Sequence, residues 1–219
     1  MSQKRQSKNN ESINNTYLKI AVKECVRYIF CREGSKIPIK RAEILKHIQS
    51  VCETPSNQVN NVIVEANNVL KTVYGYKLIQ VDAKSGVQYI VVLHDECNSL
   101  HSSVSDLQQR RLLNAALTHI YMSGGTVKED DMWKFLTETG LLEENDYAGR
   151  KLLINMITRQ MYLQYNKVGD GELARNVFEW GQRTIEEAPK MYLLKKMAEA
   201  FDKSPGHWCE QYKEATEGT

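Results

Sequence analysis

The sequence lacks several features that would mark a membrane, secreted or disulfide-bonded protein. No apolar stretch approaches the roughly 18 residues that a membrane-spanning helix needs, so we do not expect an integral membrane protein. The N-terminal segment is polar and has no apolar signal-peptide core, so we do not expect secretion. The five cysteines are odd in number and form no CxxC pair, which argues against a disulfide framework or a thiolate zinc site and favours reduced thiols in cytosol or nucleus.

Motifs of the common catalytic classes are also missing. The chain has no GxxxxGK[ST], no GxGxxG after a predicted strand, no HExxH and no GxSxG. Its five histidines lie far apart, and the acidic runs Glu129–Asp131 and Glu143–Glu144 stand at a helix start and in a loop, where acids are common. Cys25 and Cys52 fall on apolar helix faces, where burial would blunt a thioester cysteine. We therefore expect a non-enzyme that uses no cofactor or metal.

Charge is unevenly distributed along the 219 residues. The net charge is +2, but residues 1–50 hold 11 lysines and arginines against 4 acids. Such a basic front end is compatible with nucleic-acid binding and equally with a solvated arm. Residues 1–15 contain one aliphatic side chain, Ile13, so they cannot bury enough surface to offset their ordering entropy, and we expect them to be disordered.

Apolar periodicity predicts the same order of elements twice. The first half has helical spacing over about 16–32, 41–52 and 56–74, with an extended piece at 36–39. Two β-type runs, Tyr76–Val81 and Val87–Leu93, follow. The second half has helical patterns around Leu113–Ile120, Met132–Leu136 and Leu152–Ile157, with a capping-box pattern at Thr126–Glu129. A hairpin of Tyr162–Val168 and Asn176–Trp180, a helix over about 184–202 and a short helix after Pro205 complete the prediction.

Three helices followed by a two-stranded wing is the winged-helix plan. The expected fold class is therefore mainly α with small β-hairpins (α+β), built as tandem winged-helix domains. We expect a disordered arm at 1–15, winged-helix domain A at 16–95, a linker at 96–105, winged-helix domain B with extra C-terminal helices at 106–215, and a tail at 216–219.

The two predicted third helices differ in their suitability for nucleic acid. Residues 56–74 carry Lys71 as their single cation, whereas the later helix and its wing carry Arg150, Lys151, Arg159, Lys167 and Arg175, with Asn155 and Thr158 beside them. Phosphate contacts supply affinity without sequence information, so this set favours weak, sequence-tolerant DNA binding. An ordinary mixed-charge surface is the competing interpretation, because acids such as Glu143 and Asp170 lie nearby.

The first helix has an unusually wide apolar stripe. Ile29 and Phe30 are adjacent and point about 100° apart on a helix. If Ile29 faces the core, Phe30 and Val26 extend the stripe sideways. This indicates either a protein interface or burial under the neighbouring domain.

Six separate motifs give the chain a resemblance to a known family. Ile37–His47 looks like the opening signature of the MAGE homology domain, and Val73–Leu78 resembles its VFGYKL-like segment. In the second half, Ile120–Gly125 is similar to IFMxGN. The remaining matches are Tyr162–Tyr165 with KYLEY, Phe178–Arg183 with FxWGPR, and Lys190–Leu194 with KMKVL. The motifs are collinear over about residues 16–215.

Within that family the chain most resembles the members that act as non-SMC element three. The resemblance implies a subunit of the SMC five/six complex that binds and stimulates a RING-type ubiquitin ligase subunit (element one). It also implies contact with a kleisin (element four) and double-stranded DNA in repair and chromosome maintenance. The implied location is the nucleus, on chromatin, and also the cytoplasm; no membrane and no small-molecule substrate are implied.

The family's dileucine pair, tied to RING-partner binding, aligns with Ile29-Phe30, so the implied partner-binding residues are Ile29, Phe30 and Val26. The chain departs from the family pattern in a shorter loop at 145–153 and in Gln182, which replaces the proline of WGPR and is expected to loosen that corner. A sequence-specific winged-helix transcriptional regulator is the alternative function. The low positive charge of residues 56–74 counts against it.

Overall fold

The computed structural model describes residues 2–52, 54–83, 86–95, 107–171 and 174–217, with side chains from residue 17 onward. The chain divides into two compact units, Met1–Asp95 and Glu96–Thr219. The predicted linker, 96–105, lies outside the described residues. Across the described ranges, no helix is both long enough and apolar enough to cross a membrane.

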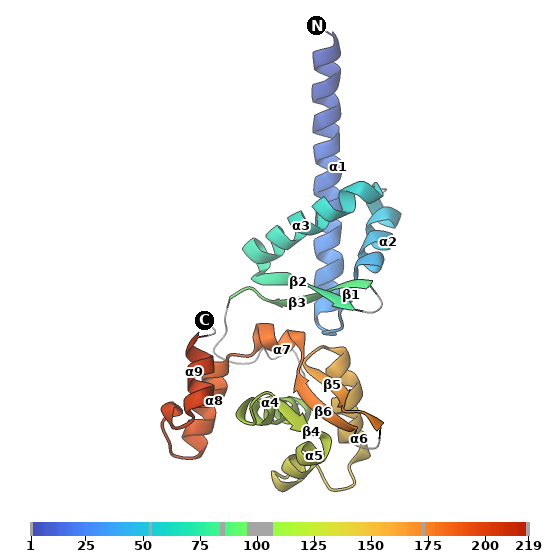
Figure 1. Cartoon of the computed structure of the whole chain (residues 1–219). Helices are drawn as coiled ribbons and strands as arrows, with labels where there is room; N and C mark the ends of the chain where they lie inside the picture. The colour runs from blue at the N-terminus through green and yellow to red at the C-terminus, as the bar shows by residue number, and fades with distance from the viewer. Residues whose placement is uncertain (1, 53, 84–85, 96–106, 172–173, 218–219) are drawn as a thin grey trace. The chain divides into compact units, whose positions relative to one another are not determined.

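Unit 1 is a winged helix whose wing is a small antiparallel sheet with the strand order β1-β3-β2 (Figure 1). Its elements in chain order are α1 (Ser2–Glu33), β1 (Ile39–Lys40), α2 (Arg41–Cys52), η1 (Ser56–Gln58), α3 (Val59–Val69), the π-helical η2 (Leu70–Tyr74), β2 (Tyr76–Ala83) and β3 (Gly86–Leu93). Gly75 adopts the left-handed φ of 70° that ends η2 and turns the chain into β2.

The core of unit 1 follows the predicted apolar periodicity. Cys25 and Ile29 of α1 are fully buried with Ile44 of α2 and Val62 of α3. Leu78 of β2 pairs with Val91 of β3, and both side chains join this core because paired residues lie on the same face of a sheet. The core therefore fixes which side of α1 faces inward, and which side is left outside.

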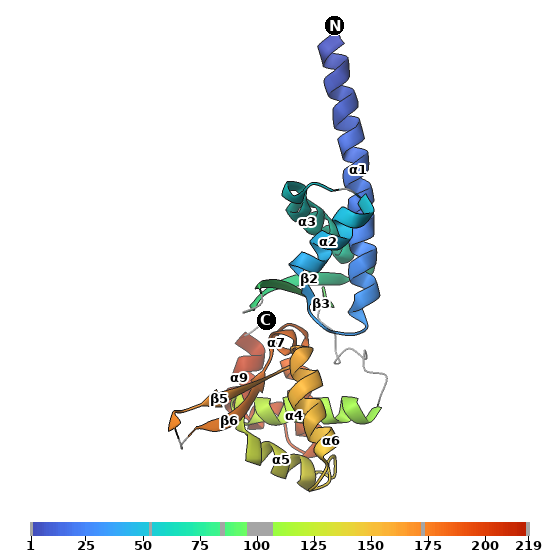
Figure 2. The ribbon, with the colours of Figure 1, turned by 90° about the vertical axis from the view of Figure 1, so that its right-hand side faces the viewer.

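The N-terminal segment differs from the expectation of disorder. Residues 2–15 are helical and continue α1 beyond the other helices of its unit, as both views show (Figures 1 and 2). Low apolar content excludes burial, but it does not exclude a helix, because helical hydrogen bonds are local. Once the packed part of α1 has formed, each added residue avoids the cost of nucleation.

Unit 2 repeats the winged-helix plan with the strand order β4-β6-β5 and adds C-terminal helices. Its elements are α4 (Leu107–Met122), β4 (Thr126–Lys128), α5 (Glu129–Glu138), α6 (Tyr147–Lys151), the π-helical η3 (Leu152–Ile157), β5 (Leu163–Val168), β6 (Arg175–Trp180), α7 (Gln182–Glu187), α8 (Lys190–Ala200), η5 (Pro205–His207) and α9 (Cys209–Glu217). The predicted α+β class of tandem winged helices is confirmed. Residues 216–217 of the predicted tail belong to α9.

Two local predictions in unit 2 are wrong. Thr126 does not cap α5, because it lies in β4 opposite Glu179 and its hydroxyl donates to that carboxylate at 3.1 Å. The single helix expected over about 184–202 is two helices, because the chain leaves helical geometry at Ala188 and Pro189. Proline removes a backbone donor and disfavours helical geometry in its predecessor, and here that preference outweighs the apolar periodicity.

The corner between β6 and α7 is closely packed despite the glutamine at position 182. A Cβ on Gly181 would lie 2.2 Å from the carbonyl oxygen of Met161, so only glycine fits there. The Arg183 guanidinium is buried, donates to the Gln160 carbonyl at 2.8 Å and pairs with Glu187 at 3.1 Å. Thr184 donates its hydroxyl to the Tyr162 carbonyl at 2.5 Å. These contacts hold the corner without any contribution from a proline.

Candidate functional site

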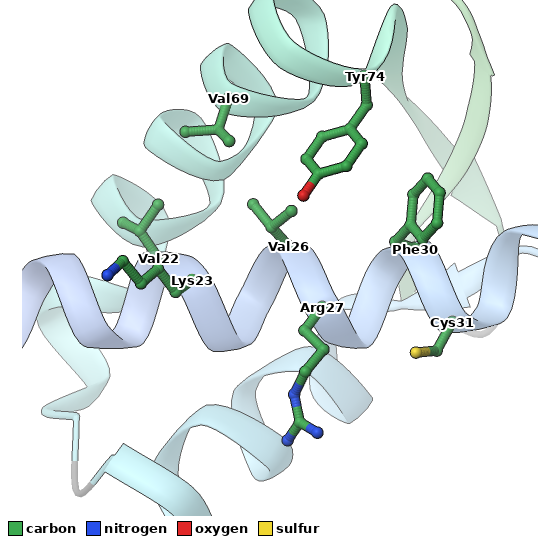
Figure 3. A pocket seen from close by; sticks show the side chains of 8 residues that line it. All are labelled: Val22, Lys23, Val26, Arg27, Phe30, Cys31, Val69 and Tyr74. Atoms are coloured by element: carbon green, nitrogen blue, oxygen red, sulfur yellow. The ribbon is translucent and has the colours of Figure 1, made fainter.

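An apolar pocket of about 380 Å³ lies on the outer side of α1 in unit 1 (Figure 3). One wall is α1, and the other is formed by the end of α3 and by η2. The lining residues are Val22, Lys23, Val26, Arg27, Phe30, Cys31, Val69 and Tyr74. Figure 3 shows Val22, Val26 and Phe30 pointing from α1 toward the side of Val69 and Tyr74.

The helical repeat explains why these side chains are available. Val22, Val26 and Phe30 are spaced by four residues, so they form one row along α1, beside the buried row that contains Cys25 and Ile29. Phe30 at the end of the row is 45% exposed. Its ring lies 5.1 Å from that of Tyr74 and 6.2 Å from that of Tyr76, so the chain holds the aromatic ring in place without covering it.

The three predicted partner-binding residues occupy different depths. Ile29 is 0% exposed and belongs to the core, which corrects its assignment as a contact residue. Val26 is 5% exposed and forms part of the pocket floor, and Phe30 forms an accessible wall. Ile29 and Phe30 are adjacent on a helix and point about 100° apart, so they could not both be buried in the core or both be exposed in the pocket. Phe30 is thus the predicted residue that a partner could reach directly.

Sequence reasoning missed the opposite wall of the pocket. Val69 and Tyr74 belong to the predicted third helix, where periodicity assigns the core face but gives no sign of an open groove. Tyr74 and its neighbour Val73 are 46% and 67% exposed. The sequence signal for this wall was the pair of apolar residues directly before Gly75, Val73 and Tyr74. The exposed end of an ordinary surface helix does not need two such side chains.

The cationic residues predicted for DNA binding in unit 2 are only partly brought together. Lys151 and Arg159 are exposed on α6 and after η3, in a row with Asn155 at four-residue spacing. Arg150 is engaged internally, because its guanidinium donates to the Glu144 carbonyl at 2.7 Å and lies 5.3 Å from the ring of Trp133. The Thr158 hydroxyl donates to backbone carbonyls of its own helix, including that of Asn155 at 3.1 Å, so it is not presented to a base edge.

The wing does not concentrate its two cations on one face. Lys167 pairs with Asn176, and Val168 pairs with Arg175. Since paired residues share a face and successive residues alternate, Lys167 and Arg175 point to opposite faces of the hairpin. A duplex lying on one face of the wing would therefore meet one of them.

The shortened loop before α6 is held by its own hydrogen bonds. Asp146 caps α6, its carboxylate accepting from the Gly149 backbone amide at 2.9 Å. A Cβ on Gly149 would lie 2.2 Å from a methyl group of Leu142, so the glycine permits close packing there. The approach to the third helix is thus well defined although the loop is short.

The described cysteines and two of the histidines differ in how deeply they are buried. Burial raises the pKa of the Cys25 thiol to about 12, so it is not a reactive thiolate. Burial also raises the pKa of Cys52, while Cys31 and Cys209 are exposed. The His119 ring stacks on Phe135 at 4.0 Å, and burial lowers its pKa, which favours the neutral imidazole. His47 stacks on Tyr28 at 4.4 Å.

The arrangement described above has known counterparts. The sequence profile of the MAGE homology domain matches residues 25–111 and 94–191. The human protein "Non-structural maintenance of chromosomes element 3 homolog" is 32% identical over 210 residues, which covers 90% of this chain and 66% of the human one. The mouse protein of the same name is 31% identical over 210 residues, covering 90% of this chain and 72% of its own. This chain therefore spans about two thirds of the human relative's length.

A solved structure is similar over nearly the whole chain. A chain of the "Nse1-Nse3-Nse4 complex" superposes with a TM-score of 0.74 at 29% sequence identity. The match covers 91% of this chain and 97% of the other. The likeness therefore extends over both winged-helix units.

Proposed function

The chain belongs to the MAGE family, and we propose that it serves as the non-SMC element three subunit of an SMC five/six complex. In this role it is a non-catalytic scaffold that binds and stimulates a RING-type ubiquitin ligase subunit, element one. It also contacts the kleisin, element four, and double-stranded DNA. It acts in the nucleus, on chromatin.

The observation that carries this proposal is the open apolar pocket on α1. Its lining exposes an aromatic ring, Phe30, that is held by Tyr74 and Tyr76 and is therefore ordered before a partner arrives. Burying apolar area contributes roughly 25 cal/mol per Å², and a rigid aromatic anchor loses little side-chain entropy when bound. The pocket is thus suited to receiving a protein partner.

The DNA contact is supported by a smaller set of residues than the sequence indicated. Lys151 and Arg159 lie exposed in one row, and no described carboxylate lies within 4.0 Å of either cation. The Arg150 guanidinium is already hydrogen-bonded to the Glu144 carbonyl and lies over the Trp133 ring. We therefore assign weak, sequence-tolerant phosphate contacts to Lys151 and Arg159, which gives no support to a sequence-specific transcriptional regulator.

The proposal is tested by substituting Phe30 alone. Ile29→Ala would create a core cavity and cost roughly 2–5 kcal/mol, so a double substitution would confuse folding with binding. For Phe30→Ala we expect about 2 kcal/mol of lost binding to the RING subunit, or roughly a thirtyfold rise in Kd. We also expect the stimulation of ubiquitin transfer to be lost in proportion.

The matched control is Tyr17→Ala, which removes another exposed aromatic ring from α1 outside the pocket. Binding is measured by titrating the full chain with the RING subunit, and folding by circular dichroism. Retention of parental affinity by a folded Phe30→Ala chain would contradict the proposed site. Absence of the RING and kleisin subunits from the chain's purified native complex would contradict the proposed function.

A further inference from the structure

The outer face of α1 carries two parallel rows of side chains with different chemistry. The apolar row is Val22, Val26 and Phe30, and the cationic row is Lys19, Lys23 and Arg27. Each row repeats at four residues, close to one helical turn. The rows therefore run side by side along α1. Lys23 and Arg27 are among the residues that line the pocket, and Figure 3 shows the Arg27 side chain projecting to the side of α1 away from Val69 and Tyr74.

The cations of this row are available to a partner. Lys19, Lys23 and Arg27 are all exposed. Arg27 pairs at 2.6 Å with Glu24 of the same helix, yet its side chain remains 64% exposed. Among the described residues, no carboxylate lies within 4.0 Å of the ammonium group of Lys19 or Lys23. The pocket edge thus has an excess of positive charge next to an apolar floor.

We propose that the segment seated in this pocket is an amphipathic helix whose apolar side chains are flanked by a row of aspartates or glutamates. This inference rests on the proposed function and specifies the chemistry of the partner. A helix presents apolar anchors at three- and four-residue spacing, which matches the spacing of Val22, Val26 and Phe30. Its carboxylates would lie opposite Lys19 and Lys23, whereas Arg27 already pairs with Glu24.

Nucleic acid fits the same surface less well. Phosphate contacts need cations, which the row supplies, but they leave Phe30 and Val69 against a charged backbone. An acidic amphipathic helix uses both rows at once. Complementary charge next to an apolar anchor also speeds encounter and rejects partners whose flank is basic.

The test compares two double charge reversals in the full chain. Lys19→Glu/Lys23→Glu changes the row, and Lys40→Glu/Lys46→Glu makes the same change in net charge at exposed positions of unit 1 outside the pocket. Affinity for the element one subunit is measured at about 0.05 and 0.5 M salt. For the row variant we expect binding at least about tenfold weaker at low salt, shrinking to about threefold at high salt. For the control we expect less than about threefold at both.

Each result has one meaning. If Phe30→Ala weakens binding and the row variant behaves like the control, the acidic helix is refuted and the proposed function stands. If a folded Phe30→Ala chain and the row variant both bind like the parent, the proposed site fails as well. If the row variant loses affinity for a double-stranded DNA oligonucleotide but not for the subunit, the row is a nucleic-acid contact and the inference is overturned.

Discussion

At the scale of single residues, Glu129 shows what sequence periodicity cannot detect. In the sequence it is an ordinary acid at a helix start. In the structure its carboxylate accepts hydrogen bonds from Tyr165 at 2.7 Å, Asn176 at 2.8 Å and Trp133 at 3.2 Å. It thereby ties α5 to both strands of the wing. Burial favours a higher pKa for Glu129, but the three hydrogen bonds outweigh it and the pKa lies below its usual value.

Replacing Glu129 with glutamine is expected to destabilise unit 2 by about 1–3 kcal/mol at neutral pH. The amide brings its own donor to a site that already contains three donors, so at least one hydrogen bond is lost. Because the folded pKa is depressed, the carboxylate's contribution is complete above the ordinary value of 4.5 and disappears as pH falls through the folded pKa. The stability gap between parent and variant should therefore narrow below about pH 4.5.

Urea unfolding at several pH values measures this gap. Glu138→Gln is the matched control, because Glu138 ends the same helix and, within the part of the chain that the structure describes, makes one ion pair, an exposed one with Lys134 at 3.9 Å. That control should change stability by less than about 0.5 kcal/mol. A Glu129→Gln chain as stable as the control would refute the role assigned to this carboxylate.

The extent to which a side chain is covered by its neighbours is the second property that the sequence does not reveal. Periodicity placed Cys25 and Ile29 on the inner face of α1 correctly, since apolar spacing reports direction around a helix. It does not report how far a neighbouring element reaches over a side chain. Whether Phe30 is covered depends on where Val69 and Tyr74 lie, and that is a property of the tertiary structure.

At the scale of elements, the order of helices and wings could be predicted, because apolar residues repeat with a different period in a helix and in a strand. Gly75 was correctly assigned as the end of the third helix from its neighbours alone. The π-helical turns Leu70–Tyr74 and Leu152–Ile157 could not be foreseen, because the same apolar residues fit an α-helix. Such a turn contains one residue more than an α-helical turn, so it changes the direction of the side chains within and after it, which include Tyr74 in η2 and Arg159 after η3.

The exposed row on α6 and after η3 carries an element-scale prediction. For Lys151→Glu/Arg159→Glu we expect weaker binding to double-stranded DNA of any sequence. The slope of log affinity against log salt should fall by about two, since each phosphate contact contributes about 0.9. Lys195→Glu/Lys203→Glu, a reversal at exposed positions outside this row, is the control. Fluorescence anisotropy at several salt concentrations gives both slopes, and equal slopes for the two variants would contradict the assignment.

At the scale of the whole molecule, the chain combines two winged-helix units with a pocket on the first and a small cationic row on the second. The resemblance seen in six sequence motifs is borne out by the match to the MAGE homology domain and by the solved structure. Two of the motif residues show why the sequence motifs and the fold agree. Gly181 and Arg183 of the FxWGPR-like segment are required by close packing and a buried ion pair, so the motif reports the fold.

Function at this scale depends on the surface that the fold leaves open. Burial raises the pKa of the Cys25 thiol to about 12, whereas Cys31 is exposed and lines the pocket. Cys209 is also exposed, lies in unit 2 and serves as an internal reference. These thiols allow the native chain to report on the occupancy of the pocket without any substitution.

The most direct measurement is the rate at which a maleimide alkylates each cysteine, followed by mass spectrometry with and without the RING subunit. If the pocket is the docking site, bound partner should slow the alkylation of Cys31 at least about tenfold and leave Cys209 unchanged. Unchanged alkylation of Cys31 in the assembled complex would show that the partner binds elsewhere, and the account of this surface would be wrong.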